Sequence, residues 1–403
     1  MKISIREEVP SMQLNRYAKI VSPTSHKEFD RRHGAVQAKM KEKGIEGILL
    51  YGSYIRQCGA IRYFVDFPTG GTNGLYAIMP DEGGLALFGH GHVNSTTIPK
   101  ELAYRVDINF GYPYAGIAGF TLPHIFDEVV KYVKKRNMKR IGLYRTGMLP
   151  YDFVRTIADN IPGVELVQVD DMLDEIMAVK SEEELEICRY VCKVHDQIYA
   201  ALPVLVRPGK REKDLTNEIQ KIATDLDCEG LNIMIGAGNP MAHHQHYFFQ
   251  NKVIQENDYI DLLVEVSVAG GYYGELSRMW SLSEPDEEMI ELNKHSMEVQ
   301  DILAAAARPG VPAAKLMEIL HDYQKEHGYK LEDRFFGHSQ GLDLTQRPLY
   351  AYDENMLLQE NMFISIHPAM ENSHMWAFNT DNYIITKEGA VRVNQTPRGI
   401  FRV

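Results

Sequence analysis

The chain has 403 residues, of which 24% are charged and 44% are hydrophobic, and its formal net charge is −12. At about 100–200 residues per domain, this length predicts two or three domains with sizeable cores. The acidic balance argues against a general attraction to nucleic acid or to anionic membranes. No apolar run reaches the roughly 18 residues that a membrane-spanning helix needs, so we expect neither class of partner.

The N-terminal sequence and the cysteines both bear on the compartment. The start, MKISIREEVPSMQL, has no apolar core and carries two early glutamates, so we expect no secretory signal. Four cysteines in a chain of this length give no disulfide framework. Cys188 and Cys192 lie four residues apart and are expected on one buried helix face rather than in a redox pair. We therefore expect a cytoplasmic protein.

The first part of the chain alternates between helical and strand patterns. Residues 27–45 predict an amphipathic helix that ends at Gly44. Further along, helices are predicted in FDEVVKYVKKRNM and DFVRTIADNIPG, and strands in GILLYGS, GLYAIMP, GLALFGH, RIGLYR and VELVQVDD. This alternation predicts an N-terminal α/β domain over residues 1–170.

The rest of the chain, residues 171–403, predicts an α+β domain. Ser181 followed by Glu184 is a capping-box pattern that opens a long helix over residues 181–205. Three more helices follow, interleaved with the strand-like runs DYIDLLVEVSV, GYYGELSRMWSL, MFISIHPAM and DNYIITKEG. The triplet RPG introduces a helix at 207–209 and again at 308–310, which hints at a duplicated half-domain.

A histidine-rich loop is the first candidate for chemistry. NPMAHHQHYF contains His243, His244 and His246 after an apolar run. Neutral imidazole serves as a general base or as a metal ligand near neutral pH. A solvated turn is the alternative interpretation, which applies most to His243 and His244.

Two carboxylates in a predicted hairpin form the second candidate. Glu265 lies inside an apolar strand, and Glu275 follows the turn at Gly270 and Gly271. A carboxylate that faces a core is costly unless it is paired, protonated or functional. If the two strands pair across this turn, both carboxylates point toward one cavity; the alternative places one or both on the solvent face.

Two further histidines complete the set. His338 lies between glycine-containing turns in FFGHSQGLDLTQRP, and His367 ends the apolar run ISIHPAM. Either histidine alone is compatible with a hydrogen-bonded core residue. Together with Glu275 and His246, they predict a single polar site.

The order of these motifs resembles the pita-bread superfamily, which includes aminopeptidase P, prolidase, methionine aminopeptidase and creatinase. The resemblance rests on AVKSEEELEICR, the loop histidine, GYYGELSR, GHSQGLDLTQRP and ISIHP, and it extends from about residue 27 to the end. It implies an N-terminal α/β domain of the creatinase type followed by a C-terminal pseudo-symmetric pita-bread domain. It also implies a homodimer. We expect residues 66–76 of the N-terminal domain to cap the cavity, either of their own subunit or of the partner subunit.

Metallopeptidases of this superfamily hold two metal ions with two Asp, one His and two Glu. By resemblance, the first Asp falls at Leu263 or Val264, the second at Glu275, and the histidine at His338. The two glutamates fall at His367 and Thr380. Since apolar and neutral side chains cannot bridge two cations, the resemblance argues against a two-metal peptidase.

Creatinase, which works without metal, resembles this pattern more closely. Its catalytic histidine aligns with His246, twelve residues before Asp258. The resemblance therefore predicts a metal-independent, creatinase-like C–N hydrolase of a small polar molecule, not a peptidase, with no cofactor. The catalytic residues expected are His246 as general acid and base, Glu275 and Glu265 as its carboxylate partners, and His338 and His367 as hydrogen-bond donors. Substrate contacts are expected from Tyr273, Arg347, Thr345 and Thr380.

Two other functions are compatible with the same residues. Glu265, Glu275, His338 and His367 offer two carboxylates and two imidazoles, which suffice for one metal ion in a hydrolase, a lyase or a peptidase-like enzyme. A non-catalytic binding protein that kept the fold is the second alternative.

Overall fold

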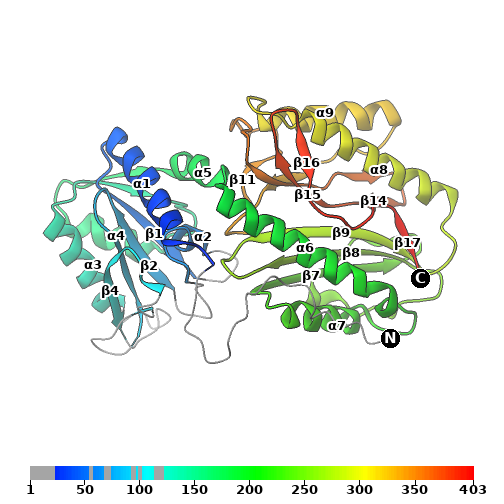
Figure 1. The fold of residues 1–403 in the computed structure, drawn as a ribbon, viewed down its shortest axis with the longest axis horizontal. Coiled ribbons are helices and arrows are strands. Elements are labelled where there is room, and N and C mark those ends of the chain that lie inside the picture. The colour runs from blue at the N-terminus through cyan, green and yellow to red at the C-terminus, as the bar shows by residue number, and fades with distance from the viewer. Residues whose placement is uncertain (1–22, 54–57, 68–73, 92–96, 99–101, 113–121) are drawn as a thin grey trace.

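The computed structural model describes residues 23–53, 58–67, 74–91, 97–98, 102–112 and 122–403. These residues form two lobes, with the N-terminal lobe in blue through cyan to green and the C-terminal lobe in green through yellow to red (Figure 1). The predicted domain boundary after residue 170 falls within α5 and remains a prediction. The N-terminal signal prediction and residues 68–73 of the predicted cap lie outside the described residues.

The N-terminal lobe is a six-stranded sheet in the order β4-β3-β2-β1-β5-β6. Its strands are β1 (Gly47–Gly52), β2 (Leu75–Pro80), β3 (Leu85–His90), β4 (Val106–Tyr112), β5 (Arg140–Leu143) and β6 (Glu165–Gln168). Its helices are α1 (His26–Lys43), α2 (Gly59–Arg62), α3 (Leu122–Arg136), α4 (Tyr151–Asn160) and α5 (Asp170–Ala178). The predicted α/β alternation is therefore confirmed, and β4 is the strand that the sequence pattern missed.

The C-terminal lobe contains two helix pairs and two larger sheets. The helices are α6 (Glu182–Leu205), α7 (Glu212–Asp225), α8 (Glu287–Ala306) and α9 (Ala313–His327), with the short 3-10 turn Tyr247–Phe249. The four-stranded sheet runs β17 (Ile400–Arg402), β9 (Tyr273–Ser281), β8 (Tyr259–Ser267) and β7 (Gly230–Gly238). The five-stranded sheet runs β11 (Gln346–Leu349), β10 (Gly337–Ser339), β12 (Phe363–Ile366), β15 (Asp381–Ile385) and β16 (Ala390–Arg392). A separate ribbon pairs β13 (Ala369–Glu371) with β14 (Trp376–Phe378).

The long helix α6 is fixed at its start by the predicted capping box. The Ser181 hydroxyl accepts a hydrogen bond from the Glu184 amide, and the Glu184 carboxylate accepts one from the Ser181 amide. From there α6 runs across the β7–β9 sheet (Figure 1). Cys188 and Cys192 are free thiols buried on its inner face, as the helical spacing predicts.

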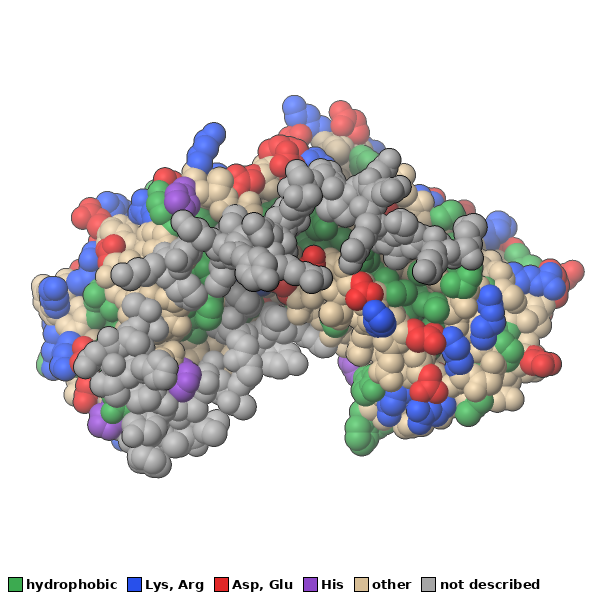
Figure 2. Space-filling model, turned by 60° about the horizontal axis from the view of Figure 1, so that its bottom comes forward, with side chains coloured by type: hydrophobic (Ala, Val, Ile, Leu, Met, Phe, Trp, Pro, Cys, Tyr) green, Lys and Arg blue, Asp and Glu red, His purple; other side chains and the backbone are tan. Residues whose placement is uncertain are grey.

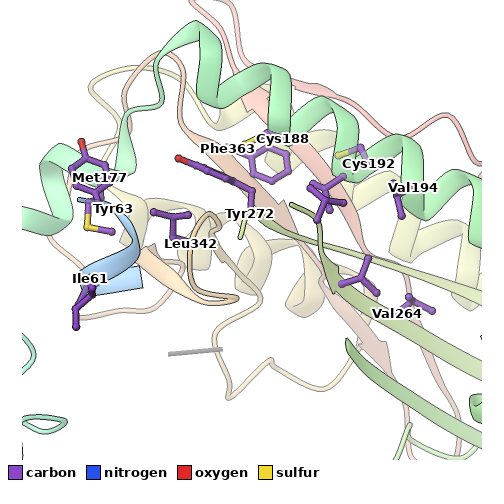
Figure 3. Packing of buried hydrophobic residues seen from close by; sticks show 14 of the residues in the cluster. Ile61, Tyr63, Met177, Cys188, Cys192, Val194, Val264, Tyr272, Leu342 and Phe363 are labelled. Carbon is purple, nitrogen blue, oxygen red and sulfur yellow. The ribbon is translucent and has the colours of Figure 1, made fainter. Parts of the chain in front are cut away.

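One apolar core joins the two lobes. Figure 3 shows Ile61 and Tyr63 of the N-terminal lobe in the same cluster as Cys188, Val264 and Phe363. Polar contacts tie the same junction, because Asp343 accepts hydrogen bonds from the Gly59 amide and from Arg145. The turn that follows β10 is therefore held against the N-terminal lobe.

Charges of both signs are mixed on the face seen in Figure 2, where acidic and basic side chains alternate over the lobe on the right. Charged side chains also form ion pairs elsewhere on the surface, such as Lys315 with Glu318. No helix among the described residues is long and apolar enough to cross a lipid bilayer.

Candidate metal centre

The β8–β9 hairpin places two carboxylates side by side. Glu265 of β8 is directly opposite Glu275 of β9, and the turn between the strands uses Gly270 and Gly271 with positive φ angles of 89° and 82°. Because strand side chains alternate, Glu265 and Glu275 share one face of the sheet. Only 6% of Glu265 and 2% of Glu275 is exposed, so both carboxylates face inward and the solvent-facing alternative does not apply.

Two histidines reach Glu275 from the other sheet. His338 lies on β10, and His367 directly follows β12, which is antiparallel to β10. The Nε2 atoms of both rings are 3.7 Å from Oε1 of Glu275. Nδ1 of His338 lies 3.0 Å from the carbonyl oxygen of Ser339. In the neutral ring, Nδ1–H donates to this oxygen, so the lone pair of Nε2 points toward Glu275.

Burial controls the charge state of these four groups. Burial raises the pKa of Glu265 to about 7, and the neighbouring Glu275 carboxylate adds to this rise. Burial likewise raises the pKa of Glu275 to about 7, although a hydrogen bond from Ser365 opposes the rise. Burial lowers the pKa of His338 and, more strongly, that of His367. The cluster therefore combines neutral imidazoles with a pair of carboxyl groups. Among the described residues, no arginine or lysine forms an ion pair with Glu265 or Glu275.

These donors fit one transition-metal ion. Ligand atoms from Glu275, His338 and His367 all lie within 4.8 Å of one another, and all three side chains are buried. Two imidazoles and one carboxylate are a known ligand set for zinc and for non-haem iron. Glu265 lies beside this trio as a second carboxylate, held by the Asn232 amide. Among the described residues, this is the one cluster of three such side chains.

The register of the hairpin changes the mapping made from sequence. That mapping places Leu263 or Val264 in the first acidic position of the superfamily. In the folded hairpin Leu263 is opposite Ser277, and Glu265 is the residue that meets Glu275. The centre therefore keeps two carboxylates, which belong to glutamates and not to aspartates.

The histidine loop contributes a different residue from the one expected. His246 is exposed and precedes the 3-10 turn, so the structure does not bring it to the cluster. His244 points inward instead, with Nδ1 2.5 Å from Oδ2 of Asp261. The ring of His244 lies 5.1 Å from that of Phe378, which in turn lies 5.7 Å from His367. Sequence spacing alone does not distinguish these histidines, because the loop has no regular period.

The four predicted substrate-contact residues fall in two places. Tyr273 shares the sheet face of Glu275, and Thr380 pairs with Ser277, with its buried Oγ1 free of any partner in the described structure. Arg347 and Thr345 are not brought to the cluster. Arg347 forms ion pairs with Asp171, Asp174 and Glu354, which use its guanidinium at the lobe junction. Thr345 is exposed in the turn before β11.

Aromatic side chains line one side of the centre. Trp376 and Phe378 of β14 stack on each other, and His243 lies 4.0 Å from Trp376. Phe335 lies 5.7 Å from His338, on the chain segment that leads into β10. Sequence analysis missed Asp261 and Phe335. The alternation of Asp261, Leu263 and Glu265 along one strand is the signal that would have found Asp261.

Comparison with protein families gives two matches that together span most of the chain. Residues 186–396 match the metallopeptidase family M24, and residues 32–179 match the creatinase/prolidase N-terminal domain. Among solved structures, the prolidase from Pyrococcus horikoshii OT3 matches with a TM-score of 0.75 at 21% identity, covering 91% of this chain and 99% of that one. The X-Pro aminopeptidase from Thermotoga maritima MSB8 matches with a TM-score of 0.76 at 18% identity, covering 92% and 99%. The predicted pita-bread architecture is confirmed.

Curated relatives are more informative about activity. The Xaa-Pro dipeptidase of Pyrococcus furiosus is 26% identical over 283 residues, which cover 68% of this chain and 79% of the relative. The probable dipeptidase PepE of Mycobacterium tuberculosis H37Rv is 26% identical over 263 residues, which cover 64% of this chain and 69% of the relative.

The expectation of a metal-independent, creatinase-like C–N hydrolase that is not a peptidase is wrong. The matching family is one of metallopeptidases, and both relatives are named dipeptidases. The error has a physical cause, since replacing a carboxylate by an imidazole at His367 changes the type of donor without removing it. Residue identities alone suggest a loss of ligands, whereas the fold brings two imidazoles and a carboxylate within 4.8 Å of one another.

Proposed function

Because the chain belongs to metallopeptidase family M24, we propose that it is a metal-dependent hydrolase of the peptidase type, with one metal ion held by Glu275, His338 and His367. The substrate class is a small peptide, which the names of the dipeptidase relatives support. The single observation that carries the proposal is the convergence of Nε2 of both histidines on Oε1 of Glu275.

The protein's own groups prepare this centre for a cation. His338 is oriented by the Ser339 carbonyl, and Glu275 is held by the Ser365 hydroxyl. When bound, an ion of this kind polarises a carbonyl group and lowers the pKa of water. Burial raises the pKa of both Glu265 and Glu275 to about 7, so either carboxyl group can exchange a proton near neutral pH. The buried Phe378 ring lies 5.7 Å from His367, on one side of the centre.

Metal analysis with activity measurement tests this proposal. Protein purified without chelator should carry about one equivalent of zinc, iron or manganese by mass spectrometry, and chelation should remove its activity on a dipeptide panel that includes Xaa-Pro substrates. His338→Ala and His367→Ala should lose both the ion and the activity. His374→Ala is the matched control, because His374 is an exposed histidine paired with Glu288.

Two outcomes would contradict the proposal. A wild-type protein that binds no ion with at least micromolar affinity would remove the metal centre. Stoichiometric metal without cleavage of any dipeptide would remove the peptidase assignment and would favour a binding protein.

Assembly and compartment are further proposals. A homodimer is implied by the sequence resemblance, and light scattering coupled to size-exclusion chromatography would measure the mass directly, with 45.9 kDa expected for one chain. A cytoplasmic location remains a proposal that cell fractionation tests.

A further inference from the structure

We propose that Asp261 is a positioning residue, which fixes the tautomer and orientation of the His244 ring so that its Nε2 atom is presented to the metal centre. This inference deepens the proposed function and rests on it. Asp261 lies on β8 four residues before Glu265, on the same face of the sheet.

Each carboxylate oxygen of Asp261 has a side-chain partner. Oδ2 lies 2.5 Å from Nδ1 of His244, and Oδ1 accepts a hydrogen bond of 3.2 Å from the Ser277 hydroxyl. Asp261 has no exposed surface at all. A buried carboxylate is costly unless it is hydrogen-bonded or paired, and the His244 ring and the Ser277 hydroxyl meet this need for Asp261.

The backbone brings the loop to Asp261 at a position where only glycine fits. Gly236 of β7 is opposite Asp261, and a Cβ atom on Gly236 would meet the carbonyl oxygen of His243. The next residues of the loop are fixed by two backbone hydrogen bonds between Gln245 and Ile235, of 3.2 and 2.9 Å. The loop therefore crosses β7 at close range, which places the His244 ring over Asp261.

The position of the ring connects it to the metal centre. His244 lies 5.1 Å from Phe378 and 5.5 Å from Trp376, and Phe378 also contacts the proposed ligand His367. Burial lowers the pKa of His244, but the Asp261 carboxylate outweighs burial and raises it. A carboxylate that accepts from Nδ1–H leaves Nε2 as the free nitrogen of the neutral ring. His244 can thus exchange a proton at Nε2, which faces away from Asp261.

Imidazole nitrogen NMR tests this inference independently of catalysis. In ¹⁵N-labelled, metal-free wild-type protein, long-range ¹H–¹⁵N correlations should show His244 with its neutral proton on Nδ1, assigned by the signals lost in His244→Gln. In Asp261→Asn the amide N–H group donates to Nδ1, so the proton should move to Nε2. In the metal-loaded enzyme the same variant should lose about 100-fold in kcat with little change in KM, because proton transfer contributes about 10²–10⁴-fold.

Asp258→Asn is the matched control. Asp258 is a buried aspartate just before β8 whose carboxylate bonds Lys252 and the Gln255 amide. The same substitution there should leave the His244 tautomer and kcat unchanged. Ser277→Ala is a milder second variant that keeps the Asp261–His244 contact, so it should retain the Nδ1–H tautomer even if Asp261→Asn fails to fold.

The outcomes separate this inference from the proposed function. A wild-type His244 with its proton on Nε2 overturns the inference, and so does a variant Asp261→Asn whose kcat is unchanged. A third outcome is that the His244 tautomer switches in Asp261→Asn but the metal-loaded wild type cleaves no dipeptide. This outcome supports the positioning role of Asp261 and overturns the proposed peptidase function.

Discussion

Buried carboxylates occur in two regions of this protein, and their partners differ. At the junction of the lobes, Glu28 and Glu184 are matched by Arg31 and Arg32 at distances between 2.6 and 3.2 Å. At the hairpin, Glu265 and Glu275 face each other and two neutral histidines. The arginines hold the pKa of Glu28 low despite burial, whereas the hairpin pair has raised pKa values. The first region stabilises the fold, and the second is the site at which we propose that a metal ion binds.

The largest expected effect comes from breaking the junction. Arg32 is almost fully buried and bonds Glu28 and the Tyr272 hydroxyl. Arg32→Ala removes the buried guanidinium and leaves Glu28 and Glu184 only the partly exposed Arg31 as a cationic partner. The free energy of unfolding should therefore fall by about 3–5 kcal/mol in urea titrations. Lys39→Ala on the same helix removes an exposed pair with Glu42 and should give no resolvable change. Equal effects of both variants would contradict the assigned structural role.

Glu275→Gln should weaken metal binding without lowering the stability of the fold, in contrast to Arg32→Ala. The substitution keeps the side-chain size but removes a ligand charge, so metal affinity should fall by at least about 100-fold, which isothermal titration measures. The metal-free protein should lose no stability, because the change relieves repulsion with Glu265. A large loss of stability without loss of metal would show that Glu275 acts as the junction carboxylates do.

Gly236→Ala tests the loop rather than the ligands. Its Cβ atom would displace the His243 backbone and with it His244. We expect kcat to fall by about 10–100-fold, since small misplacements of a reacting group are costly, while the metal content stays at the wild-type level. Unchanged kcat would mean that the loop adapts without moving the ring.

The last expected effect appears only on acidification and concerns a neutral histidine near the junction. Burial lowers the pKa of His33, whose Nε2 lies 3.1 Å from the Phe64 carbonyl oxygen, from 6.5 to about 4. The unfolded chain therefore binds the additional proton between these values. The stabilisation is complete above about pH 6.5 and is lost as the pH falls toward 4, by at most about 1.4 kcal/mol per pH unit. His33→Gln should flatten this part of the stability curve; an unchanged slope would assign the pH dependence to other groups.

The sequence by itself determined the two-lobe fold, the approximate positions of the main helices and the candidate residues Glu265, Glu275, His338 and His367. It could do so because strand alternation, helix caps and glycine turns act over a few neighbouring residues. Only the tertiary structure decided that Glu265 is opposite Glu275, that His244 rather than His246 points inward, and that Arg347 is occupied at the junction. Those facts depend on register and on contacts between residues far apart in the chain, which local patterns do not encode.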